Sequence, residues 1–160
     1  MSTTSALGLA FAIGVIAGLR AMTAPAVVSW AAYLGWIDLR QTWLAFLGYT
    51  ATPYIASTLA VGELINDKLP KTPSRKAPVS FAARIVTGAF SGTALSLAGA
   101  HTAIAGALLG GLGAVVGTLG GYEARTRLVK VMGVPDYVIA LLEDAVAIAA
   151  GLFIVSRMSS

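Results

Sequence analysis

The sequence predicts an all-α integral membrane protein, a polytopic bundle of about five apolar elements, and three observations support this prediction. The chain of 160 residues is 57% hydrophobic and only 11% charged, whereas soluble domains average about 25% charged residues. The apolar residues form long blocks rather than amphipathic stripes, and a block of about 20 residues is long enough to cross a bilayer as a helix. Basic residues collect between the blocks, as the orientation of membrane proteins requires.

The first apolar block, 6–36, contains three residues that disfavour a continuous membrane helix: Arg20, Thr23 and Pro25. Proline lacks an N–H group and clashes with the carbonyl four residues back, and it restricts the residue before it. We therefore predict two half-helices that meet near 20–25, with Thr23 as the N-cap of the second. The block is either one kinked span or a re-entrant pair, and we favour the kinked span.

Arg20 and the start of the second half-helix suggest an anion site. An arginine at bilayer depth costs at least about 2.5 kcal/mol, so Arg20 needs an anionic partner. A helix N-terminus carries partial positive charge, and broken membrane helices use such ends to hold anions. Arg20 therefore either contacts an anionic substrate or pairs with an acidic residue on another helix.

The second block, 43–65, leads into the first acidic motif. Pro53 is expected to bend this span, which closes with the sequence Glu63-Leu64-Ile65-Asn66-Asp67-Lys68. Glu63 and Asp67 are four residues apart, so they share one face of the helix.

Three further spans are predicted: 81–99, 103–121 and 138–155. Two basic loops, 68–80 and 122–134, flank the first two of these spans. Because two spans separate the loops, both lie on the same side of the membrane, which the positive-inside rule assigns to the cytoplasm. The whole chain, 1–160, is predicted to be one transmembrane domain.

Glycines at intervals of three or four residues predict how the helices pack. Small residues at this spacing let helix backbones approach closely, and such packing drives association in lipid. The longest series lies in the fourth span: Gly106, Gly110, Gly113, Gly117 and Gly121. This face either closes a monomeric bundle or forms a seam with a second copy or another membrane subunit.

Charged residues within or beside the predicted spans are the candidate functional residues. They are four acids and two bases: Glu63, Asp67, Glu143, Asp144, Arg20 and Arg84. One interpretation assigns all four acids to proton coupling, because buried carboxylates serve this purpose in transporters, and gives substrate binding to a second set: Arg20, Thr23, Glu63 and Arg84. The other interpretation treats the acids and bases as a structural ion network.

The two halves of the chain show a similar order of features. In the first half, the break near Arg20 is followed by a helix that carries Glu63. In the second half, basic residues are followed by a helix that carries Glu143, and this helix is predicted to run in the opposite direction. Inverted repeats with a central site are common in transporters. We therefore expect an inverted repeat.

Several classes of function are not expected. The chain has no cysteine and one histidine, His101, so neither a thiolate site nor a histidine-cluster metal site is expected. It lacks phosphate-binding, dinucleotide-binding and nucleophile-elbow motifs. We expect neither an enzyme nor a cofactor, and no nucleic-acid partner, since the net charge of +4 comes from loops that orient the protein in the membrane.

Four motifs support a family assignment: Gly18-Leu19-Arg20 with Pro25, Glu63-Leu64-Ile65-Asn66-Asp67-Lys68-Leu69-Pro70, Arg84 with Gly88, and Leu142-Glu143-Asp144. Together they resemble a family of small bacterial inner-membrane proteins that is known only as a domain of unknown function. The resemblance extends over about 7–155. It implies a compact polytopic helical bundle in the bacterial inner membrane, and it implies no activity.

Two functions are therefore carried forward. The first is a secondary transporter or channel-like carrier of a small anionic solute, coupled to protons through the buried carboxylates. The second is a structural or assembly subunit of the membrane, whose buried charges form a stabilising ion network. We favour transport because ionisable residues inside a membrane are usually functional.

Overall fold

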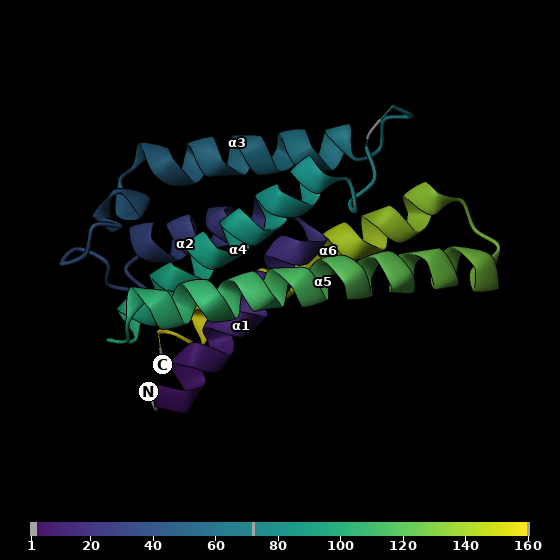
Figure 1. Cartoon of the computed structure of the whole chain (residues 1–160). Coiled ribbons are helices and arrows are strands. Elements are labelled where there is room, and N and C mark those ends of the chain that lie inside the picture. Colours follow the sequence, from purple (N-terminus) through teal and green to yellow (C-terminus); the bar gives the residue numbers. More distant parts are fainter. Residues whose placement is uncertain (1–2, 72, 160) are drawn as a thin grey trace.

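In a computed structural model of the protein, the described residues are 3–71 and 73–159, and they form helices and no strand. The elements are α1 (Thr3–Leu19), α2 (Thr23–Tyr33), the 3₁₀ helix η1 (Ala45–Gly48), α3 (Ala51–Asn66), α4 (Pro78–Ala98), α5 (Ala103–Met132) and α6 (Asp136–Ser156). Figure 1 shows them as one elongated bundle with both chain termini at the same end. The all-helical prediction is confirmed.

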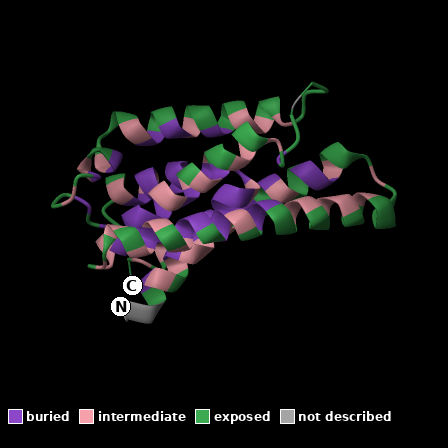
Figure 2. Cartoon of the chain, in the orientation of Figure 1, coloured by how far each residue is buried: buried purple, intermediate pink, exposed green. Residues whose placement is uncertain are grey.

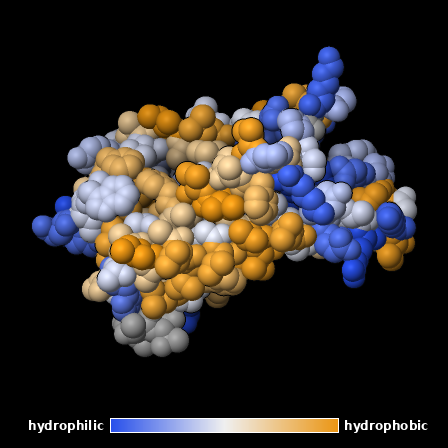
Figure 3. Space-filling view, viewed as in Figure 1, coloured by the Kyte–Doolittle hydropathy of each residue, from blue (hydrophilic) through white to orange (hydrophobic). Residues whose placement is uncertain are grey.

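Three of these helices, α4, α5 and α6, are long and apolar enough to cross a membrane. Helix α1 is apolar but shorter. Helices α2 and α3 have 11 and 16 residues, or about 16 and 24 Å, against a hydrocarbon core of about 30 Å. Figure 3 shows a broad apolar band across the molecule and hydrophilic residues at the end where α5 meets α6. The apolar helices indicate a membrane protein, although three rather than five elements have the length of a span.

The first apolar block breaks where predicted and then reverses its direction. Helix α1 ends at Leu19 and α2 begins at Thr23. Ile16 and Val27 lie at the same level of the bundle, because a Cβ on Gly151 would contact both side chains, at 3.7 and 3.3 Å. In Figure 1, α2 returns toward the end of the bundle at which α1 begins. The block therefore forms a hairpin of two half-helices, not the straight-running kinked span that we favoured.

Prolines mark the beginnings of α2, α3, α4 and α6. Pro25 and Pro53 are the third residues of α2 and α3, in the first turn, where a missing N–H group costs no intrahelical hydrogen bond. Pro53 therefore starts a helix instead of bending one. The expected span 43–65 accordingly begins later, at Ala51, and Trp43 lies in the preceding turns.

The second basic segment differs from its prediction as a loop. Helix α5 continues to Met132 and ends at Gly133, which adopts a left-handed conformation with φ of 61°. Arg127 donates to Glu123 four residues earlier at 2.7 Å, a pairing that supports helical structure. The basic residues of 122–132 therefore lie on a helix that extends beyond its neighbours.

Helices α1, α4 and α5 pack with their backbones in direct contact. A methyl group on Gly110 would collide with the Gly88 carbonyl oxygen, and one on Gly117 would collide with the Val15 carbonyl oxygen. The contact of α5 with α1 and α4 uses four glycines of the predicted series: Gly106, Gly110, Gly113 and Gly117. At Gly121 an added methyl group would meet the Leu19 side chain at 2.5 Å. A homodimer through this series would therefore displace α1 or α4.

The outer faces of the bundle are apolar. Figure 2 shows buried residues concentrated on the α1–α2 hairpin and exposed residues along the outer side of α3. Helix α5 exposes a stripe of large apolar side chains: Ile104, Leu108, Leu112 and Val116. A helix that is apolar all round is typical of a membrane span.

The two halves of the chain each contain three helices. Helix α3 runs toward the end at which α5 meets α6, whereas α6 runs away from it. The acid-bearing helices thus have opposite directions, as an inverted repeat requires. The corresponding helices differ in length, and the repeat stays a prediction.

Candidate functional site

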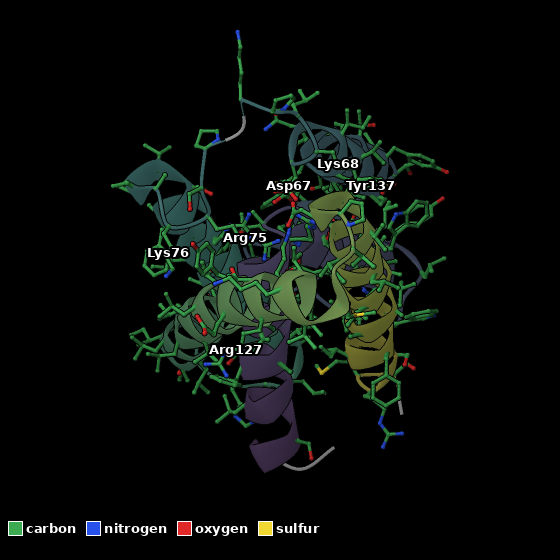
Figure 4. The ribbon with its side chains drawn as sticks, turned by 90° about the vertical axis from the view of Figure 1, so that its right-hand side faces the viewer. Asp67, Lys68, Arg75, Lys76, Arg127 and Tyr137 are labelled. Atoms are coloured by element: carbon green, nitrogen blue, oxygen red, sulfur yellow. The ribbon has the colours of Figure 1, made fainter. Side chains whose placement is uncertain are left out.

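Charged side chains gather around the turn between α1 and α2. In Figure 4, which looks onto this end of the bundle, Asp67 and Arg75 lie toward its centre, and Lys76 and Arg127 lie at its edge. Arg84 is six residues along α4 from Pro78, which places it about 9 Å inside that end of the helix. Arg84 therefore lies almost two helical turns inside the start of α4.

The broken helix is capped by two side chains of opposite charge. Arg84 Nη1 donates to the carbonyl oxygens of Gly18 and Leu19, both at 2.8 Å. The backbone N–H groups of Ala21 and Met22 donate to the two carboxylate oxygens of Glu63, also at 2.8 Å. Helix ends leave such carbonyl and N–H groups without partners, and their dipoles favour a cation at the first end and an anion at the second.

Arg20, at the tip of the hairpin, is fully buried among carboxylates. Its Nη1 lies 2.7 Å from Asp67 Oδ2, and its Nε and Nη2 both lie 2.5 Å from Asp144 Oδ1. Glu143 is farther away, at 3.8 Å. Arg20 therefore joins the C-cap of α3 to the middle of α6.

Three further bases surround these acids. Arg75 donates from both terminal nitrogens to both oxygens of Glu143. Lys68 Nζ lies 2.6 Å from Asp144. Arg125 lies 3.2 Å from Asp67 and 2.5 Å from Asp136. These contacts tie α3, α5, α6 and the loop before α4 to the hairpin tip.

The resulting network contains five bases and five acids and is electrically neutral. Its members are Arg20, Lys68, Arg75, Arg84, Arg125, Glu63, Asp67, Asp136, Glu143 and Asp144. Four members of the network were not among the predicted site residues, because the sequence indicates loops or a helix start at their positions: Lys68, Arg75, Arg125 and Asp136. The excess of acids in the predicted set, four against two bases, was the signal that further bases had to reach the site.

The structure brings all but one of the predicted site residues together. Thr23, expected as an N-cap, is instead the first residue of α2, whose N-cap is Met22. The Glu63 carboxylate accepts instead from the backbone N–H groups of Ala21 and Met22, which precede the helix. Thr23 lines a separate apolar groove with Trp30 and Ser57.

An ion pair outside the network shows the effect of exposure. Asp38 and Arg40 lie in the loop after α2, and Arg40 Nη2 donates to Asp38 Oδ2 at 2.8 Å. Hydrogen bonds from the Arg40 side chain, and then from its backbone N–H, lower the pKa of Asp38 to about 2. Both side chains are largely exposed, so the pair serves as a reference for the buried network.

Two cavities open on the network. One, of about 250 Å³, is lined by Glu63, Asp67 and Arg84 together with Asn66, Ser80 and Ala83. The other, of about 280 Å³, is lined by Asp67, Arg75 and Arg125. Asp67 and Pro73 border both cavities. The Glu63 side chain is therefore partly accessible, at 18%, whereas Arg84 is buried and Arg20 has no accessible surface.

The arrangement is suited to holding charge and protons rather than metal. Among the described residues no group of histidine, cysteine and acidic side chains is arranged to hold a metal ion. The acids instead form ion pairs with arginine and lysine side chains and accept hydrogen bonds from backbone N–H groups. Such a site can bind an anion, exchange protons or fix the helices in place.

Comparison with known proteins gives a family and no assigned activity. No curated protein and no solved structure matches the chain. The model of the family DUF4126, described as a domain of unknown function, matches residues 7–156. This range contains every residue of the network, and the family resemblance expected from the sequence is confirmed. The chain therefore belongs to the family of the domain of unknown function DUF4126.

Proposed function

We propose that this protein is a proton-coupled carrier of a small anion in the bacterial inner membrane, with its charged end toward the cytoplasm. A cluster of ten charged residues supports the proposal. Three of them, Arg20, Arg84 and Asp144, are buried among apolar helices, and ionisable residues at such positions usually serve ion or proton pathways. Apolar side chains of similar volume would hold helices together as well as a buried ion network does. The polar hairpin tip adds support, since carriers commonly place their sites at broken helices.

The observation that carries the proposal is the loose pairing of Glu63 with Arg84 at the wall of a cavity. Each of the other four acids has a base within 2.7 Å, whereas the nearest base to Glu63 is Arg84 at 3.8 Å. Glu63 is therefore the one acid of the network without a close ion pair, and its partners at 2.8 Å are backbone N–H groups. Arg84, which no carboxylate closely neutralises, is the residue suited to an incoming anion.

The proposal narrows the roles expected from the sequence. Arg20, Asp67, Glu143 and Asp144 are held in close ion pairs, and we assign them to holding the hairpin tip. Glu63 carries the coupling proton and Arg84 contacts the anion. Thr23 has no part in the site.

A structural or assembly subunit is the second candidate, and the environment of Arg20 favours it. Arg20 is fully buried and lies in close ion pairs with carboxylates from two other helices, an arrangement that can fix the register of the bundle. In that case the cavity beside Glu63 would bind nothing.

The experiment that separates the two candidates measures proton flux into liposomes. Purified protein is reconstituted with a pH-sensitive dye inside the vesicles, and an inward gradient of propionate, chloride or phosphate is applied. We expect at least one anion to acidify the lumen faster than in protein-free liposomes, and Glu63→Gln to abolish this difference. Arg40→Gln, which changes an exposed arginine outside the network, should keep the wild-type rate. A folded protein that gives no added flux with any anion would support the structural candidate instead.

A further inference from the structure

We propose that the anion is a short-chain monocarboxylate, which binds in the place that the Glu63 carboxylate occupies. This inference rests on the carrier function proposed above and identifies its substrate class. Glu63 is in this view a tethered stand-in for the substrate.

The backbone donors at the hairpin tip match a carboxylate. The Ala21 N–H group donates to Glu63 Oε1 and the Met22 N–H group donates to Oε2, both at 2.8 Å. Two neighbouring donors that bind two different oxygens select a planar group with two acceptor atoms. A monatomic anion such as chloride presents one acceptor to this pair.

Arg84 has donor capacity that Glu63 does not use. Its side chain is 5% exposed, its Nη1 is held by the Gly18 and Leu19 carbonyl oxygens, and its Nε has no hydrogen-bond partner. A buried donor without a partner is unfavourable. Glu63 is held on α3 with its Oε1 3.8 Å from Arg84 Nη2, whereas a free carboxylate on the same N–H groups can approach the guanidinium closely.

The cavity beside Glu63 limits the size and charge of the ligand. Its volume of about 250 Å³ equals that of about eight water molecules at roughly 30 Å³ each, which suits an acid of a few carbon atoms. Arg84 is the one basic residue among the described residues that line it, and Asp67 lines it as well. A second carboxylate on the ligand would lie beside Asp67, whose neighbouring bases Arg20 and Arg125 are already in ion pairs, so the cavity favours a monocarboxylate over a dicarboxylate.

The exchange conserves charge when Glu63 takes up a proton. The incoming carboxylate brings one negative charge to the N–H groups of Ala21 and Met22, and the proton removes one from Glu63 as its side chain leaves them. One proton is therefore bound for each anion. The apparent affinity must rise as the pH falls, by at most tenfold per pH unit.

Calorimetric titration of the full-length protein in detergent with propionate tests the inference. Measurements at several pH values, in buffers of different ionisation enthalpy, give both the affinity and the number of protons taken up. For the wild type we expect uptake of one proton per propionate and tighter binding at lower pH. For Glu63→Gln we expect binding without proton uptake and without pH dependence, because the amide accepts an N–H hydrogen bond but takes no proton.

A second variant tests the location independently of Glu63. Ala83 is exposed on α4 and lines the cavity, so Ala83→Trp fills the cavity without changing a charge. We expect it to weaken propionate binding at least tenfold while the unfolding temperature stays at the wild-type value. Chloride and succinate should bind the wild type at least tenfold more weakly than propionate.

The outcomes separate failure of this inference from failure of the carrier function. Proton uptake that persists in Glu63→Gln, or full affinity in Ala83→Trp, would refute displacement of Glu63. A wild type that does not bind propionate, while chloride or phosphate still drives proton flux into liposomes, would refute the monocarboxylate and leave the carrier function standing. Propionate binding without flux for any anion would refute the carrier function and leave a carboxylate site.

Discussion

At the scale of single residues, two arginines of this chain have opposite environments. The Arg20 side chain has no exposed surface and lies against Asp67 and Asp144, whereas the Arg40 side chain is 86% exposed beside Asp38. Exposed ion pairs contribute little because water and salt screen them. Removal of one partner from a buried pair leaves an uncompensated charge and is strongly destabilising.

We expect Arg20→Ala to destabilise the protein by roughly 3 kcal/mol or more. The double variant Arg20→Ala/Asp144→Asn should regain part of this loss, because it removes a carboxylate that would keep only Lys68 as a close base. The recovery should be partial, since Asp67 remains. Thermal unfolding in detergent measures both changes.

Arg40→Ala is the matched control for that experiment. It should leave the unfolding temperature unchanged, and it should raise the pKa of Asp38 from about 2 toward 3.8 by removing the hydrogen bonds from the guanidinium. Because the folded-state pKa of Asp38 is depressed, the pair's small stabilisation is present above about pH 4 and is lost as the pH falls toward 2. Equal unfolding temperatures for Arg20→Ala and Arg40→Ala would contradict the buried network.

At the scale of elements, helix ends and glycines decide how the hairpin is held. Arg84 of α4 and Glu63 of α3 cap the two ends that the break exposes. Helix α1 lies against α5 along glycines, where Gly113 and Gly117 admit the backbone of α1. Since lipid supplies no hydrophobic drive for helix association, this close packing is what holds α1 in the bundle.

Two glycines of the same helix give a matched test of this packing. Gly110→Ala places a methyl group against the Gly88 carbonyl oxygen, whereas a methyl group at Gly120 meets nothing within 4 Å. We expect Gly110→Ala to lower the unfolding temperature. Gly120→Ala should leave it unchanged or raise it, because alanine favours helix by up to about 1 kcal/mol over glycine. Equal behaviour of the two variants would show that the seam is not closely packed.

At the scale of the whole molecule, charge is arranged in two parts at one end of the bundle. The ten residues of the network cancel one another. Lysines outside it remain exposed at this end: Lys71, Lys76 and Lys130. They provide the uncompensated positive charge that orients membrane proteins, while the neutral network can lie deeper.

Reporter fusions test this orientation. The hairpin returns α2 to the end where α1 begins, so the N-terminus, the C-terminus and the turn at His101 should share one side. Fusions at these three places should read periplasmic, and fusions at Arg75 and Arg127 should read cytoplasmic. Replacing the three lysines with glutamine should produce mixed orientation. A cytoplasmic N-terminus together with a periplasmic C-terminus would contradict the hairpin.

The sequence by itself determined the class of the protein, the place of its break and its family. Long apolar blocks specify helices because a backbone in lipid has to satisfy its hydrogen bonds within each segment. The break near Arg20 follows from the restrictions of proline and the cost of a buried charge, both local properties. The acidic motifs around Glu63 and Glu143 identified the residues from which the network is built.

Only the tertiary structure decided the direction of the chain after the break and the partners of each charge. A kinked span and a hairpin have the same local sequence, and the difference lies in whether Val27 packs beside Ile16 or far from it. Arg75 and Arg125 read as loop residues because their nearest neighbours in sequence are polar. They reach the site because α3, α5 and α6 converge on the hairpin tip. Ion pairing acts over a few ångströms in space between residues far apart in the chain, and spacing in the sequence does not record that proximity.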